Sequence, residues 1–253
     1  MLSTRDKELL SKLDLDYPAV AIKYCFSLPE NAEPIGKTLS FCQFIKEAQD
    51  TGRKFYITKD DDNCFGKMVL GMTEKTPFAA SGQAGYDFGV YRTQAPNARL
   101  YNMIPTLVRG SVNYVLFSPV SVCDFDPDLI VAVAKTSKAD IIMRATSYIS
   151  GDLWESKSSA VLSCAWMYVH TYLSGKVNFI ITGMHHGLKR RKIYPEGLHI
   201  IAIPYQKFCE FFTSLAEMDW ELIAMRDDEE SKRILASKME AWQRIDPDFS
   251  LKK

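Results

Sequence analysis

Residues 126–134 read DPDLIVAVA, a turn followed by six apolar residues. A short apolar run that follows a turn and is rich in Ile, Val and Leu is typical of a strand buried on both faces. The run is too short to span a membrane, which takes about 20 apolar residues. We therefore predict a fully buried strand at Leu129–Ala134.

Further strands and helices alternate along the chain on both sides of this run. Strands rich in β-branched and aromatic residues are predicted at Ala19–Phe26, Lys54–Thr58, Asn113–Phe117, Asn178–Thr182 and Leu198–Ile203. Helices are predicted at Leu2–Leu13, Phe41–Asp50, Cys64–Gly71, Ala95–Met103, Ser137–Ser150, Ser158–Ser174 and Tyr205–Glu217, and loops at Pro77–Val90 and Gly183–Arg191. This alternation predicts a mixed α/β (α+β) fold, a sheet with helices packed against it.

The length and composition predict one mixed α/β domain over residues 1–253, because 253 residues with 47% hydrophobic content can bury a sizeable core. A charged helical tail is expected at residues 221–245.

An internal repeat is a further hypothesis. Gly52–Cys64 and Gly151–Cys164 each begin at a glycine that ends a helix and reach a cysteine near the start of another helix. A true repeat would divide the chain into pseudo-repeated halves at residues 18–110 and 111–216. The alternative is a chance likeness, since the identities are few.

The charge balance and the N-terminal sequence restrict the class of protein. The 31 basic and 31 acidic side chains cancel, which argues against a nucleic-acid binder, since such proteins carry a basic excess. The N-terminal stretch lacks the apolar core of a signal peptide, and no stretch is long and apolar enough for a membrane span. We therefore expect a cytoplasmic protein with six free cysteines. The neutral charge, the 12% aromatic content and the charged tail also permit a homodimer.

Three cysteines form the first candidate site. Cys42, Cys64 and Cys164 lie at or near predicted helix starts, where the helix dipole lowers the pKa of a thiol and favours the thiolate. Three thiolates that converge could ligate a soft metal or an iron–sulfur cluster. The alternative is that they are buried small hydrophobic residues, since no Cys-x-x-Cys pair is present. Cys25 and Cys209 are interpreted as core residues.

A basic segment, GMHHGLKRRK at residues 183–192, forms the second candidate site. Neutral imidazoles at His185 and His186 could ligate a metal or exchange protons. Arg190 and its basic neighbours suit a carboxylate or a phosphate. The alternative is a solvated loop between two strands.

Several segments together resemble a known family. They are PAVAIKY at 18–24, FCQFIKEAQDTGRKFYITKDDDNCFGKMVLGM at 41–72, DPDLIVAV at 126–133, the helix of Cys164 and IAIPYQKF at 201–208. In order and spacing they resemble domain of unknown function family 169, found in archaea and anaerobic bacteria. The resemblance implies that Cys42, Cys64 and Cys164 belong to the family's cysteine pattern. This chain has MHHGLKRR where the family shows small residues and Arg, so the resemblance assigns no role to residues 184–191.

Three functions remain open at this point. The first is a protein that binds an iron–sulfur cluster, of the 4Fe–4S type, or a metal through Cys42, Cys64 and Cys164. Three thiolates leave one iron for His185, His186 or an external ligand. The second is a binding module for a tetrapyrrole or corrinoid, with a Cys or His as axial ligand and the Gly-rich segment SGQAGYDFG at 81–89 close to the flat cofactor. The third is a cysteine-dependent enzyme. All three imply a small-molecule or cofactor ligand.

Overall fold

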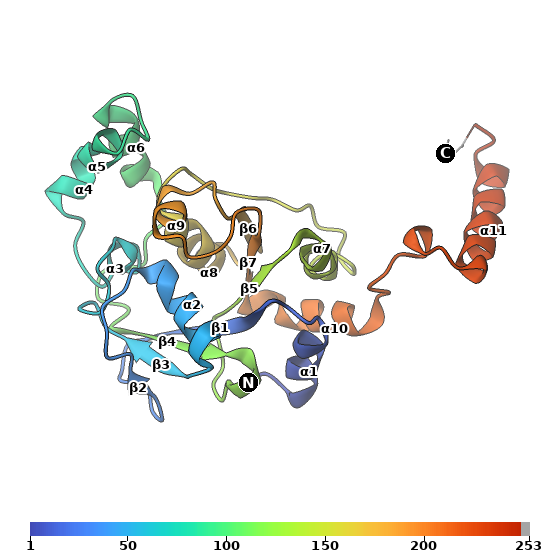
Figure 1. The fold of residues 1–253 in the computed structure, drawn as a ribbon, viewed down its shortest axis with the longest axis horizontal. Helices are drawn as coiled ribbons and strands as arrows, with labels where there is room; N and C mark the ends of the chain where they lie inside the picture. Colours follow the sequence, from blue (N-terminus) through green and yellow to red (C-terminus); the bar gives the residue numbers. More distant parts are fainter. Residues whose placement is uncertain (249–253) are drawn as a thin grey trace.

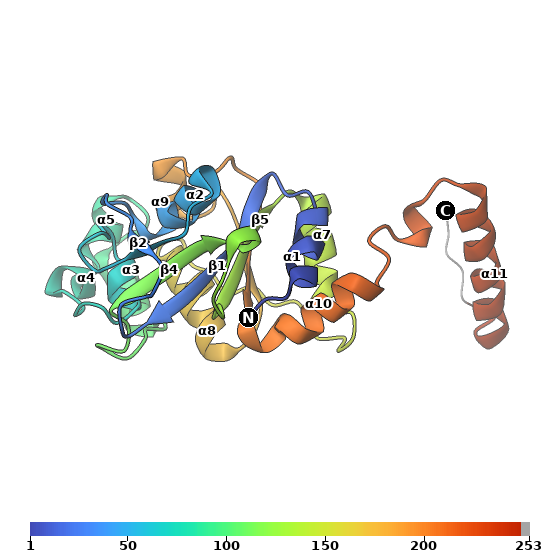
Figure 2. The same cartoon turned by 90° about the horizontal axis from the view of Figure 1, so that it is seen from below.

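The computed structural model describes residues 1–248, and seven strands of this part of the chain form one sheet (Figures 1 and 2). The strands are β1 (Tyr17–Cys25), β2 (Glu33–Pro34), β3 (Phe55–Ile57), β4 (Tyr114–Pro119), β5 (Leu129–Ala134), β6 (Asn178–Ile181) and β7 (His199–Pro204). Their order is β2-β3-β4-β1-β5-β7-β6. Neighbours are antiparallel except for β2 and β3, which are parallel.

Helices connect and cover these strands. They are α1 (Thr4–Lys12), α2 (Phe41–Thr51), α3 (Gly66–Val69), α4 (Pro77–Ser81), α5 (Gln83–Asp87), α6 (Gln94–Met103), α7 (Thr136–Ala145), α8 (Thr171–Ser174), α9 (His186–Arg191), α10 (Phe208–Glu217) and α11 (Glu229–Ile245). A π-helical stretch at Ala165–His170 runs directly into α8. The predicted mixed α/β class is confirmed.

The predicted buried strand is confirmed as β5, which lies between β1 and β7. Its side chains alternate between two hydrophobic cores, with Leu129, Val131 and Val133 in one and Ile130, Ala132 and Ala134 in the other. Because both faces of the strand are covered, none of its positions needs a polar side chain, and the sequence is a continuous apolar run.

The two cores define three layers. On one face of the sheet α1, α7 and α10 contribute Leu10, Ile142 and Phe211 to the core (Figure 2). On the other face α2 and the π-helical stretch contribute Phe44 and Tyr168. This second face carries the candidate site.

The C-terminal helix α11 stands apart from the sheet in both views (Figures 1 and 2). It begins at Glu229, capped by the Asp228 side chain, and follows a short 3-10 turn at Ile223–Met225. No helix in residues 1–248 combines the length and the apolar character needed to cross a membrane. The division into repeated halves and the homodimer stay predictions.

The prediction of a loop at residues 77–90 was wrong, because this segment contains α4 and α5. Thr76 caps α4 by accepting a hydrogen bond of 3.1 Å from the backbone N–H of Ala79. Gly82, at φ 76°, ends α4 and lets the chain turn directly into α5. A Cβ at Gly82 would lie 2.2 Å from the Gln94 carbonyl oxygen, so this glycine allows close packing against α6.

The helix predicted at Ser158–Ser174 begins only at Ser163. Upstream, the Asn178 side chain accepts from the Lys157 backbone N–H at 2.8 Å and donates to its carbonyl at 3.0 Å. These bonds take the place of helical ones at Lys157, and residues 151–162 form neither helix nor strand.

Two further boundaries differ from prediction. The helix predicted at Ser137–Ser150 ends as α7 at Ala145, where the Thr146 hydroxyl donates to the Met143 carbonyl at 2.7 Å and competes for the helical acceptor. The predicted loop at Gly183–Arg191 contains α9 instead, whose basic last turn suits the negative end of a helix dipole.

Candidate functional site

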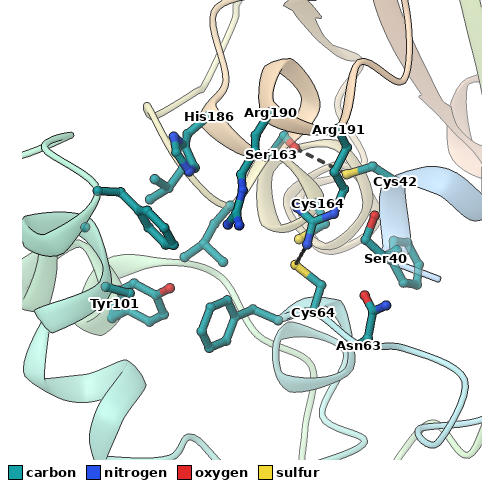
Figure 3. A pocket seen from close by; sticks show the side chains of 18 of the residues that line it. Ser40, Cys42, Asn63, Cys64, Tyr101, Ser163, Cys164, His186, Arg190 and Arg191 are labelled. Atoms are coloured by element: carbon teal, nitrogen blue, oxygen red, sulfur yellow. Dashed lines mark hydrogen bonds between the residues drawn. The ribbon is translucent and has the colours of Figure 1, made fainter. Parts of the chain in front are cut away.

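A cavity of about 400 Å³ lies among α2, α3, α9, the α4–α6 segment and the start of the π-helical stretch (Figure 3). This volume is within the range of small-molecule sites, roughly 300–1,000 Å³. Its wall carries three cysteines (Cys42, Cys64, Cys164), four aromatic residues (Phe41, Phe65, Phe88, Tyr101) and the side chains of Lys67, His186, Arg190 and Arg191.

The structure brings Cys42, Cys64 and Cys164 to this one cavity from three separate segments (Figure 3). Cys42 is the second residue of α2, directly after the Ser40 capping box. Cys64 lies two residues before α3, where its backbone N–H donates to Asp62 Oδ1 at 2.9 Å. Cys164 precedes the π-helical stretch. All three therefore lie at helix starts.

The other two cysteines considered from the sequence lie elsewhere, and neither is a fully buried core residue. Cys25 is half-buried at the end of β1, and Cys209 is exposed on α10. The apolar face of α10 buries the neighbouring Phe208 and Phe211, and Cys209 lies off that face.

The expectation that helix dipoles lower the thiol pKa values was wrong. Burial raises the pKa of Cys42 to about 12. Burial also raises the pKa of Cys164 well above its ordinary value, and the charges of Cys42 and Cys64 add to this rise. Burial raises the pKa of Cys64 as well, with the Arg191 charge opposing it. Loss of hydration outweighs the dipole at all three thiols.

Two polar groups contact the sulfurs directly (Figure 3). Arg191 Nη2 lies 3.6 Å from Cys64 Sγ, and Ser163 Oγ lies 3.5 Å from Cys42 Sγ. Within residues 1–248, neither Arg190 nor Arg191 forms a salt bridge with a carboxylate. These two guanidinium groups therefore have no direct ion pair in that part of the chain, although the charge of Arg191 acts on the Asp62 carboxyl and opposes the rise in pKa that burial causes there.

The structure separates the two adjacent histidines. His186 lines the cavity, and its ring lies 4.9 Å from the ring of Phe88. Burial, then the charges of Arg190 and Arg191, lower the pKa of His186, so the imidazole is neutral at pH 7. His185 does not line the cavity; it is buried with Nε2 bonded to the Ser158 hydroxyl.

Sequence reasoning missed the wall supplied by α5 and α6. Asn97, Tyr101 and Phe88 line the cavity from this region, which was predicted to be partly a loop. The one available signal was the glycine content: a Cβ at Gly85 would lie 2.5 Å from the Asn97 side chain. The backbone of this Gly-rich segment does pack closely against another group, as expected. That group is the Asn97 side chain rather than a flat ligand.

Gly66, at the start of α3, is expected to tolerate no side chain. A Cβ at Gly66 would lie 2.4 Å from Phe41 Cβ and 2.7 Å from Asp62 Oδ2. We expect Gly66→Ala to lower the free energy of unfolding by about 1–3 kcal/mol, since neither neighbour can move without disturbing the start of α2 or the bonds of Asp62. Urea denaturation measures this. Gly187→Ala is the control, because its Cβ would meet nothing closer than Arg191 Nη1 at 3.7 Å; an equal loss in both variants would contradict the clash.

All six cysteines are free in the structure. Thiol titration of freshly prepared protein, under denaturing and non-reducing conditions and after removal of any metal, is expected to count six thiols. A count of four would contradict the assignment to a reducing compartment.

The comparisons with known proteins identify the family. The profile of domain of unknown function family 169, described as uncharacterised ArCR, matches residues 8–213. The chain belongs to this family, as its cysteine-bearing segments indicated. It is 25% identical over 206 residues to Uncharacterized protein MJ0308 of Methanocaldococcus jannaschii, an alignment that covers 79% of this chain and 88% of that protein. No solved structure matches the chain.

Proposed function

We propose that this protein binds an iron–sulfur cluster in the cavity, through Cys42, Cys64 and Cys164. One observation carries the proposal: three cysteines that are far apart in the sequence line the same cavity. Thiolates are the protein ligands of such clusters. The 4Fe–4S type fits three protein ligands, because one iron then stays open to another group.

The proposal names a cluster rather than a single ion because the two demand different spacings of the ligands. In residues 1–248, no group of three or more His, Cys, Asp and Glu side chains is placed to hold one metal ion. Thiolates of a cluster bind different irons, so their sulfurs lie farther apart than the ligands of one ion. Charges at Cys42 and Cys64 both raise the pKa of Cys164, and a charge at Cys64 raises the pKa of Cys42, which supports a shared site for the three thiols.

The charges of the wall support the same proposal. Thiolates and cluster together are anionic, and Arg191 reaches Cys64 with a guanidinium that forms no salt bridge within residues 1–248. Because burial raises the pKa of all three cysteines, they are thiols rather than thiolates when no metal is bound. A metal displaces the thiol protons when it binds, so these protonated thiols remain competent ligands.

The chain's own residues would adjust the properties of the site. A bound cluster supplies electron transfer, or Lewis-acid chemistry at an iron that no thiolate holds. Ser163 and Arg191 can donate hydrogen bonds to the ligating sulfurs of Cys42 and Cys64, and such bonds raise the reduction potential. His186 is the histidine in the same cavity, with a buried Nε2 that has no hydrogen-bond partner.

A tetrapyrrole or corrinoid is the second candidate ligand. The observation that favours it is His186, whose Nε2 has no hydrogen-bond partner in the described chain and whose ring lies beside that of Phe88, so that His186 could ligate such a cofactor. A cysteine-dependent enzyme has less support, because a nucleophilic cysteine needs a lowered pKa and burial raises the pKa of all three thiols. The proposal suits a reducing compartment such as the cytoplasm.

The absorption spectrum and metal content of anaerobically purified protein test the proposal. We expect a broad visible shoulder, with iron and acid-labile sulfide in equal amounts. A sharp, intense band with no sulfide would indicate the tetrapyrrole instead. A colourless protein that takes up neither iron nor sulfide on anaerobic reconstitution would refute the cluster.

A further inference from the structure

The part of the cavity away from Cys42 and Cys164 has a different chemistry. We call it the anion compartment and define it by Phe88, Asn97, Tyr101, His186, Arg190 and Arg191. Phe88 directly follows α5, and α6 and α9 supply the others, so the compartment lies where the α4–α6 segment meets α9 (Figures 1 and 3).

Charge is the first feature of the compartment. Arg190 and Arg191 follow each other on α9, and neither pairs with a carboxylate in the described chain. Asp62, the acidic residue whose pKa responds to Arg191, already accepts backbone hydrogen bonds from Cys64 and Lys67, at 2.9 and 2.6 Å. Arg190 therefore remains available to an anion, and Arg191 has further N–H donors besides the one that faces Cys64. The planar donors of a guanidinium match a carboxylate.

Asn97 is the second feature. The residue is only 1% exposed and lines the cavity. Its Nδ2 donates to the Gly82 carbonyl at 3.0 Å, whereas its Oδ1 is buried and has no hydrogen-bond partner within residues 1–248. A buried acceptor without a donor is costly, and such groups are rare in folded proteins. A ligand that brings an O–H or N–H donor would satisfy it.

Flat aromatic surface is the third feature. The Phe88 ring lies 4.9 Å from the His186 ring at an interplanar angle of 32°, and the Arg190 guanidinium carbon also lies 4.9 Å from the centre of that ring. Phe88 is half exposed although it is apolar. A planar ligand could stack against this surface, because aromatic rings and guanidinium planes both favour such contacts.

We propose that the anion compartment binds a small aromatic carboxylate that carries a hydroxyl or N–H donor. The carboxylate would pair with Arg190 and Arg191, the ring would pack beside Phe88, and the donor would bond to Asn97 Oδ1. An inorganic phosphate would use the arginines but would leave both the aromatic wall and Asn97 without a role. The inference deepens the proposed function and rests on it in one respect: the ligand would lie beside the cluster, in the same cavity.

Calorimetric titration of the full chain with 4-hydroxybenzoate tests this inference, both with the reconstituted cluster and without metal. We expect saturable binding with a Kd below about 1 mM. Benzoate, which lacks the hydroxyl, is expected to bind about tenfold more weakly, since Asn97 Oδ1 then stays without a donor. Arg190→Gln is expected to weaken both ligands about tenfold, because it removes a charged hydrogen-bond donor.

Two further variants make the test specific. Lys189→Gln removes a charge from the same helix, but Lys189 faces Glu196 at 3.3 Å and does not line the cavity, so binding should stay within twofold, in line with the small effect of surface charges. Asn97→Leu should abolish the preference for 4-hydroxybenzoate over benzoate. If Asn97→Leu does not fold, the binding measured with Arg190→Gln tests the inference instead. We expect Arg190→Gln to fold, because Arg190 is exposed and makes no structural hydrogen bond in residues 1–248.

Three results would overturn the inference: no saturable binding of 4-hydroxybenzoate, tighter binding of inorganic phosphate, or equal weakening by Arg190→Gln and Lys189→Gln. Iron and sulfide content, measured on the same samples, reports on the cluster separately. A protein that binds the acid but takes up no iron would sustain this inference and refute the proposed function.

Discussion

Replacing Cys164 with serine is expected to lower the iron and sulfide retained after anaerobic reconstitution by about tenfold or more, since even the loss of a group that supports a metal ligand costs 10–100-fold in affinity. Cys164 is buried in the cavity wall, where the charges of Cys42 and Cys64 act on it. A serine oxygen is a poor ligand for a soft metal. Because position 164 is buried, no water molecule can replace the missing sulfur. Iron and acid-labile sulfide per chain, after gel filtration, measure the loss.

Two of the three cysteines outside the cavity supply matched controls. Cys25→Ser and Cys209→Ser make the same chemical change, but neither residue lines the cavity. Both variants should retain iron and sulfide at the wild-type level. Full retention in Cys164→Ser, or an equal loss in Cys25→Ser, would contradict the assignment of the ligands.

Phe117→Ala is expected to cause the largest loss of stability, about 3–5 kcal/mol in the free energy of unfolding. Phe117 is fully buried on β4, and its ring lies 5.5 Å from the ring of Phe55 and 5.8 Å from those of Phe41 and Phe44. Phe41 also lines the cavity beside Cys42. The cavity left by the substitution would therefore loosen the start of α2 as well as the core.

Guanidinium denaturation of the variant and of a matched control measures this effect. Phe26→Ala removes the same side chain from a position that is 68% exposed, so its cost should stay below about 1 kcal/mol. Comparable losses of unfolding free energy in the two variants would show that the packing of Phe117 against its aromatic neighbours contributes little to stability. The two free energies can be compared only if both variants unfold in a two-state transition.

The main strands could be predicted because their patterns are local. The run at β5 is apolar throughout since two layers of helices cover it, and this burial is visible in the sequence itself. The segments that were wrong depend on distant partners. Residues 152–162 contain no helix, and the Lys157 backbone within them is bonded to the distant Asn178 side chain. In the segment that was predicted as a loop, Gly85 packs against Asn97 of α6.

Only part of the candidate site could be predicted from the sequence. Cysteines near helix starts are recognisable in a sequence, and Cys42, Cys64 and Cys164 do line one cavity. The direction of their pKa shifts was not predictable, because burial decides it and burial depends on the complete fold. Asn97 gave no local signal, since its importance lies in a buried oxygen that only the structure reveals.

Anomalous diffraction at the iron absorption edge, from crystals of anaerobically reconstituted protein, tests the central claim most directly. The cluster proposal predicts iron peaks inside the cavity, each ligated iron about 2.3 Å from the sulfur of Cys42, Cys64 or Cys164, by analogy with other metal–thiolate bonds. Iron bound elsewhere on the chain, or no iron although the three thiols are reduced and accessible to reconstitution, would contradict it.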